Sequence, residues 1–98
     1  MHLLNAEKVE DCFDGSSVFM FFFDEPWTEK MIEKLKTLGE LDFFSDFPRP
    51  FFRLRATTGL QLKGVQGDNS CRVIFPSRNR DDVREKLEFF FRKDFTSS

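Results

Sequence analysis

The longest unbroken apolar segment of the chain, residues 18–23, lies between the turn signal Asp14-Gly15-Ser16-Ser17 and the polar stop Asp24-Glu25-Pro26. Aromatic residues between turn signals are typical of a strand, and the segment is too short to cross a bilayer. Alternation places Val18, Met20 and Phe22 on one face and Phe19, Phe21 and Phe23 on the other. Because neither face suits water, we predict the central strand of a small sheet, with helices over one face and a further cover over part of the other.

Helical spacing of apolar residues follows directly after this strand. The spacing predicts a helix over about residues 26–38, with Asp24 or Glu25 as its cap, Pro26 in its first turn and Gly39 as its C-terminal stop. Capping is the interpretation that we favour for the two carboxylates, over a role in acid–base chemistry.

A second helix is expected after Pro76, capped by Ser77 or Asn79. Its buried stripe would consist of Val83, Leu87, Phe90 and Phe91, whereas Phe89 would point away from the core.

Residues 40–50 are predicted to connect the first helix to the next strand. Leu41, Phe44 and Phe47 recur at every third position, which suits a single helical turn, and Pro48 and Pro50 then require extended backbone. The segment could serve as a hydrophobic lid, as a docking loop for a partner or as a satellite of the core, and we favour the satellite.

Residues 51–75 predict a three-stranded antiparallel meander with strands at 51–56, 60–65 and 70–75. Thr57-Thr58-Gly59 suits a three-residue hairpin loop and Gln66-Gly67-Asp68-Asn69 a four-residue loop. These loops pair Leu54 with Leu62 and Leu62 with Val73, so that the apolar residues of all three strands share one face. A slip of one residue would invert every side chain, although one long bent strand over 51–65 would keep the same parity.

The predicted fold class is therefore α+β, a two-layer sandwich. An antiparallel or mixed four-stranded sheet would carry two helices on one face, in the order strand-helix-strand-strand-strand-helix. Residues 1–98 are expected to form a single small domain. Residues 1–16 form an N-terminal segment for which helix and strand both remain open, with a helix or irregular structure favoured, and residues 94–98 are expected to fray.

The predicted register also places positive charges together on the opposite face of the meander. Arg53 lies across from Lys63, which lies across from Arg72, and Arg55 shares that face. Directly opposed like charges destabilise a sheet, so this basic row, edged by apolar residues, is a candidate site for an anionic ligand or an acidic partner. The alternative, which we favour on the sequence alone, is a solvated face whose charges stay in water or are neutralised by Glu7, Glu10 or Asp11.

Composition adds one functional lead, because the chain has 15 Phe and no Tyr. Phenylalanine packs without offering a hydroxyl, and so many rings are difficult to bury in one small core. We therefore expect some of them to form a hydrophobic contact surface. The candidates are Phe19, Phe21, Phe23, Phe44, Phe47 and Phe89.

Several other functions are disfavoured by the sequence. The net charge is −2 with the two signs interspersed, which gives no overall field for nucleic acid. We predict no membrane span and a cytoplasmic location. Cys12 and Cys71 with the single histidine, His2, are too few for a zinc site, and we predict buried thiols, no metal and no cofactor. A redox role for either thiol would need exposure and a depressed pKa.

No catalytic or family motif was found in the chain. The order of a helix, three strands and a helix is similar to that of double-stranded RNA-binding domains, but Asn79-Arg80-Asp81-Asp82 stands where their second helix opens with a lysine-rich motif. We therefore expect a non-enzymatic binding or assembly module that contacts a protein partner, or a second copy of itself as a homodimer. The alternative is an anion or nucleic-acid binder that uses Arg53, Arg55, Lys63 and Arg72.

Overall fold

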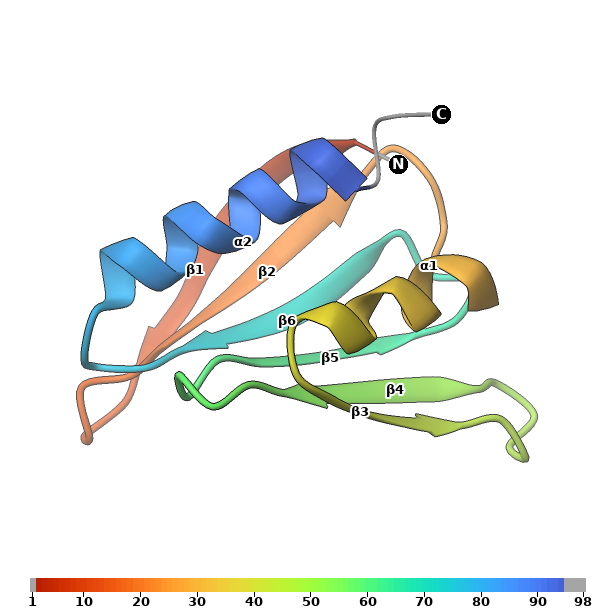
Figure 1. Cartoon of the computed structure of the whole chain (residues 1–98), viewed down its shortest axis with the longest axis horizontal. Helices are drawn as coiled ribbons and strands as arrows, with labels where there is room; N and C mark the ends of the chain where they lie inside the picture. Colours follow the sequence, from red (N-terminus) through yellow and green to blue (C-terminus); the bar gives the residue numbers. More distant parts are fainter. Residues whose placement is uncertain (1, 95–98) are drawn as a thin grey trace.

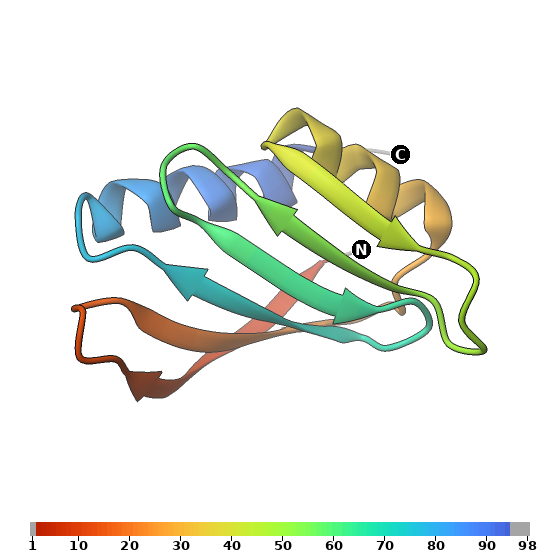
Figure 2. The same ribbon diagram turned by 90° about the horizontal axis from the view of Figure 1, so that it is seen from below.

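The structure, a computed structural model, describes residues 2–94. Its elements are β1 (Leu3–Asp11), β2 (Ser17–Phe23), α1 (Glu29–Lys34), the 3-10 turn η1 (Leu35–Thr37), β3 (Glu40–Phe44), β4 (Phe51–Arg55), β5 (Gln61–Val65), β6 (Ser70–Phe75) and α2 (Arg80–Asp94). Within the described residues, the strands form one six-stranded antiparallel sheet in the order β1-β2-β6-β5-β4-β3. Both helices lie on one face of this open sheet (Figures 1 and 2).

The small α+β class, the antiparallel sheet and the pair of helices agree with the sequence prediction, but the four-stranded sheet and the element order were wrong. The N-terminal segment is a strand, β1, and the segment predicted as a connection begins with another strand, β3. β2 is therefore an interior strand, next to an edge, and not the centre of the sheet. The helix α2 ends at Asp94, and the rest of the segment predicted to fray, 95–98, lies outside the described residues, so the fraying stays a prediction.

β1 escaped prediction because its alternation is interrupted twice. The register to β2 shifts between Leu3 and Asn5 and again between Lys8 and Glu10. The extra residues are Leu4 and Val9, both exposed. Each shift moves the following side chains by one position, which removes the period of two that identifies a strand.

β3 escaped prediction because three apolar residues at a spacing of three suggested a helical turn. The backbone instead pairs with β4, which places Leu41 opposite Leu54 and Phe43 opposite Phe52. Tertiary pairing therefore overrides the local pattern, and Leu41 and Phe43 pack against the core as partly buried residues.

The first helix is shorter than expected and begins later. The hydroxyl of Thr28 accepts a hydrogen bond of 3.3 Å from the backbone N–H of Met31, so Thr28 is the cap and not Asp24 or Glu25. The carboxylate of Asp24 instead binds the residue that precedes β1, because it accepts a hydrogen bond of 2.6 Å from the backbone N–H of His2.

The meander is confirmed in register. Leu54 pairs with Leu62, Leu62 with Val73, and Gly64 with both Phe52 and Cys71. Gly59 has the positive φ, 98°, that the three-residue loop requires.

The core lies between the helices and the sheet. Trp27 is its largest buried side chain, and its ring centroid lies 4.9 Å from that of Phe52, 5.5 Å from that of Phe23 and 6.3 Å from that of Phe91. The stripe predicted for α2 is buried as expected, and Phe89 is exposed.

Candidate functional site

The face of the sheet opposite the helices carries the predicted basic row. Arg53 on β4 pairs with Lys63 on β5, and Lys63 pairs with Arg72 on β6. The register extends this row to Asp42 on β3 at one end and to Met20 on β2 at the other. The sheet therefore brings three cations together and places an acidic residue beside the first of them.

Carboxylates on β3 neutralise two of the four predicted cations. Arg53 donates from Nη2 to Oδ2 of Asp42 at 3.1 Å. Arg55 lies 3.5 Å from the same carboxylate and 3.7 Å from that of Glu40. The N-terminal acids expected in this role do not fill it, because the carboxylate of Asp11 binds Lys8 and Ser17 instead. Sequence reasoning missed Asp42 and Glu40 because it did not assign β3 as a strand.

Lys63 and Arg72 form the part of the row that has no carboxylate partner. Both are exposed, they lie directly opposite one another, and neither side chain makes an ion pair or hydrogen bond with any residue in the described range 2–94. Opposed like charges on paired strands destabilise the sheet by roughly 0.2–1 kcal/mol. A ligand with a negative charge would offset this repulsion.

A groove of about 590 Å³ lies beside these two cations. Its apolar wall includes Met20, Phe51 and Val65, while Lys63 and Arg72 supply the charged wall. The ring of Phe51 stacks on Phe44 with centroids 4.6 Å apart and contacts Phe47 at 5.2 Å. The groove thus joins a small aromatic surface to two unpaired positive charges.

The hydrophobic contact residues predicted from the sequence divide into three groups. Phe21 and Phe23 are 0% and 1% exposed, so they belong to the core and not to a contact surface, since the helices cover their side of β2. Phe19 is partly buried on that same side, 5.4 Å from Phe75 and beneath the guanidinium of Arg84 at 4.9 Å. Phe44 and Phe47 lie near the groove, and Phe89 lies on the exposed side of α2.

One end of the groove is fixed by the turn between β5 and β6. The backbone N–H of Trp27 donates to the carbonyl of Asp68 at 2.8 Å, and the N–H of Gly67 donates back to the carbonyl of Trp27 at 2.9 Å. The indole Nε1 of Trp27 also donates to the carbonyl of Ser70 at 3.2 Å. Because Asp68 and Ser70 line the groove, the buried indole holds that end in shape before any ligand arrives.

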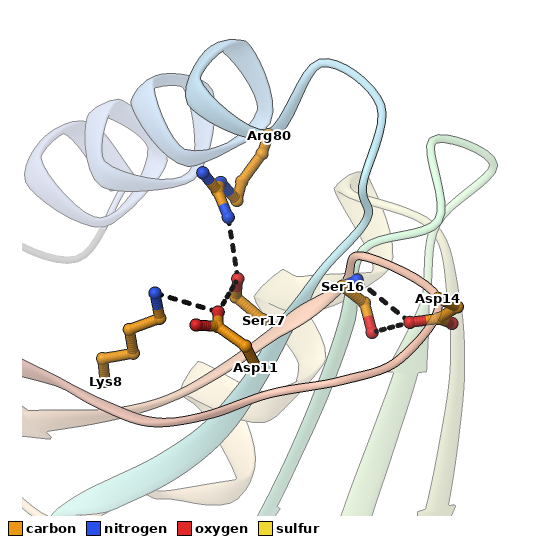
Figure 3. Close-up of polar contacts among 6 residues, drawn as sticks. All are labelled: Lys8, Asp11, Asp14, Ser16, Ser17 and Arg80. Atoms are coloured by element: carbon orange, nitrogen blue, oxygen red, sulfur yellow. Dashed lines mark hydrogen bonds and ion pairs between the residues drawn. The ribbon is translucent and has the colours of Figure 1, made fainter.

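A second polar cluster ties α2 to the hairpin of β1 and β2 (Figure 3). The hydroxyl of Ser17, which is buried, accepts a hydrogen bond of 2.9 Å from Arg80 and donates one of 3.0 Å to Asp11. Lys8 lies 2.9 Å from the same carboxylate. The hydrogen bond from Lys8, followed by that from Ser17, holds the pKa of Asp11 below its usual value. The polar groups satisfy one another, so we assign this cluster a structural role.

The two cysteines differ in burial, because Cys12 is only partly buried where a buried thiol was predicted. Cys71 is buried, and this burial raises the pKa of its thiol, which opposes the reactive thiolate. In the described part of the chain, no three His, Cys, Asp or Glu side chains are grouped so that they could hold a metal ion. No helix in the described range is long and apolar enough to cross a membrane.

Comparison with known proteins gave no match, whether with family models, with curated proteins or with solved structures.

Proposed function

We propose that this chain is a non-enzymatic binding module whose open sheet face contacts a protein partner. The observation that carries the proposal is the groove in which the stacked ring of Phe51 adjoins the unpaired cations Lys63 and Arg72. Its binding role, a cytoplasmic location and the lack of a cofactor are predictions.

The chemistry of the groove suits a protein interface. Aromatic residues, Met and Arg are enriched at such interfaces, and this groove includes Phe51, Met20 and Arg72. Large rings also provide most of the binding free energy where they lie at the centre of a contact. The proposed surface replaces the earlier candidates Phe21 and Phe23, which the helices cover.

The proposal can be tested with a display library of random peptides and two matched variants. Peptides selected on the wild-type chain should bind the Phe51→Ala variant about tenfold or more weakly, because a contact aromatic is lost. Phe89→Ala is the control, since Phe89 is also an exposed ring but lies on α2, away from the open face. Selected peptides that tolerate Phe51→Ala but lose affinity for Phe89→Ala would contradict the proposal.

A further inference from the structure

We infer that the segment recognised by the open face is an acidic peptide, in which a carboxylate lies between Lys63 and Arg72 and a neighbouring apolar side chain packs on Phe51 and Val65. This inference rests on the proposed function and specifies the chemistry of its partner. The four residues all line the same groove.

The distribution of carboxylates on the open face supports an acidic ligand. β3 supplies Asp42 and Glu40 to Arg53 and Arg55, so like-charge repulsion is relieved at that edge of the row. Farther along the row, where the groove lies, the described residues give no carboxylate to Lys63 or Arg72. Charge complementarity therefore points to negative charge that comes from the partner.

The spacing of the two cations suits one carboxylate. Directly opposed residues of an antiparallel pair have Cβ atoms about 4.5–5.5 Å apart, so both side chains can reach the same group. A carboxylate has two oxygen atoms, each of which can accept a charge-assisted hydrogen bond. The groove also contains Arg53, whose buried Nε has no hydrogen-bond partner within residues 2–94.

Carboxylates at the two edges of the open face favour a short acidic peptide over a nucleic acid. The register places Glu7 at one end of the basic row and Asp42 at the other, and Glu10 and Glu40 lie at the same two edges in the neighbouring row. A strand of nucleic acid carries a phosphate at every nucleotide, and its backbone would run past these carboxylates on leaving the groove. A peptide can confine its charge to the two unpaired cations.

A second copy of the chain is also a poorer occupant. A two-fold contact centred on the groove would bring Lys63 and Arg72 of both copies together. Four cations would then meet across the contact, and the carboxylate of Asp68, which also lines the groove, is already paired with Arg49, so charge repulsion opposes association.

The experiment uses the selected peptides with three alanine variants of equal charge change. Peptides that lose affinity on Phe51→Ala should be enriched in Asp and Glu beside an aromatic or aliphatic residue. Lys63→Ala and Arg72→Ala should each weaken their binding by about tenfold. Lys86→Ala is the control, because Lys86 lies on α2 in an exposed pair with Asp82. A mixed-sequence single-stranded RNA, followed by fluorescence anisotropy, should not bind at physiological salt.

The outcomes separate this inference from the proposed function. Peptides that require Phe51 but show no acidic enrichment, or that tolerate both Lys63→Ala and Arg72→Ala, would overturn the acidic partner and leave the open face as the binding surface. Binding of the RNA that depends on Lys63 and Arg72, or a dimer in sedimentation that Lys63→Ala strengthens, would assign the groove to another occupant and overturn the inference. A library that yields no Phe51-dependent peptide would overturn the proposed function itself.

Discussion

Lys63 on β5 lies directly opposite Arg72 on β6, and neither side chain meets a carboxylate in the described part of the chain. A sheet selected for stability alone would place opposite charges or neutral residues at such a pair. A binding surface, in contrast, keeps unpaired charges available to its partner. The proposed binding role would account for the stability that is given up at this pair.

Replacing one member of this pair should stabilise the free protein. We expect Lys63→Gln to raise the free energy of unfolding by a few tenths to about 1 kcal/mol, because the repulsion between opposed cations is removed. The gain should shrink as salt screens the charges. Urea unfolding of both proteins at low and high salt measures the effect.

Arg53→Gln is the matched control, since Arg53 is in the same row but is paired with Asp42. This variant should leave stability unchanged or lower it by up to about 1 kcal/mol. Equal effects of the two substitutions would show that the unpaired state of Lys63 has no energetic consequence.

The hydroxyl of Ser17 should be important for holding α2 on the first hairpin. Ser17→Ala removes the acceptor for Arg80 and the donor to Asp11 in a buried position. We expect the free energy of unfolding to fall by about 1–3 kcal/mol. Ser16→Ala serves as the comparison, because the hydroxyl of Ser16 donates to Asp14 in an exposed hydrogen bond within the same turn, so its loss should have the smaller effect. Thermal unfolding measures the loss of stability in each variant, and an equal loss in the two would contradict the role of the Ser17 hydroxyl.

Stability should fall in acid through three carboxylates. Hydrogen bonds from Lys8, Ser16 and His2 lower the pKa values of Asp11, Asp14 and Asp24, respectively, below 3.8. The folded state therefore favours the ionised form, and this contribution is complete above the unfolded pKa. It is lost as the pH falls below about 3.8 through the lower folded values.

Asp11→Asn tests this acid effect. The variant should be less stable at neutral pH and should lose less further stability than the wild type as the pH falls below about 4. Asp46→Asn is the control, because Asp46 makes no ion pair or hydrogen bond with any residue in the described range. Unfolding midpoints across the acidic range that fall in parallel for Asp11→Asn and wild type would contradict the role of Asp11.

Gly64 is required where the sheet passes over Phe52. A Cβ atom at this position would lie 2.6 Å from Cζ of Phe52 and 3.3 Å from Cβ of Cys71. Gly64→Ala should therefore lower the free energy of unfolding by about 1–3 kcal/mol through overpacking. The double variant with Phe52→Leu should lose less stability than the sum of the two single changes, because leucine removes the clashing ring atom. If the stability losses of the two single variants simply added in the double variant, the strain caused by Gly64→Ala would not arise from the Phe52 ring.

The sequence was most informative where turn chemistry and alternation agree. Gly59 and the apolar alternation from Phe52 to Phe75 determine the meander, and with it the opposition of Arg53, Lys63 and Arg72. The strands at the two edges could not be predicted in this way. Bulges at Leu4 and Val9 interrupt the period of β1, and the apolar spacing in β3 imitates a helical turn.

These missed strands also limited the prediction of the site. Without β3, only acids of the N-terminal segment were considered as partners of the basic row, and Asp42 was not expected beside Arg53, so the four cations seemed equivalent. Whether Phe19, Phe21 and Phe23 face solvent or the core depends on which side the helices cover, and local pattern gives both faces of that strand the same apolar character. The groove residue Met20 was therefore not distinguished from its neighbours.

The most direct test of the account is to map the backbone amide shifts of the protein by NMR as a Phe51-dependent peptide is added. If the open face binds the peptide, the largest amide shift changes should cluster at Met20, Phe51, Lys63, Val65 and Arg72. The exposed side of α2 around Phe89 should show little change. Changes centred on α2, or on the outer edge of β1, with the groove residues unaffected would contradict it.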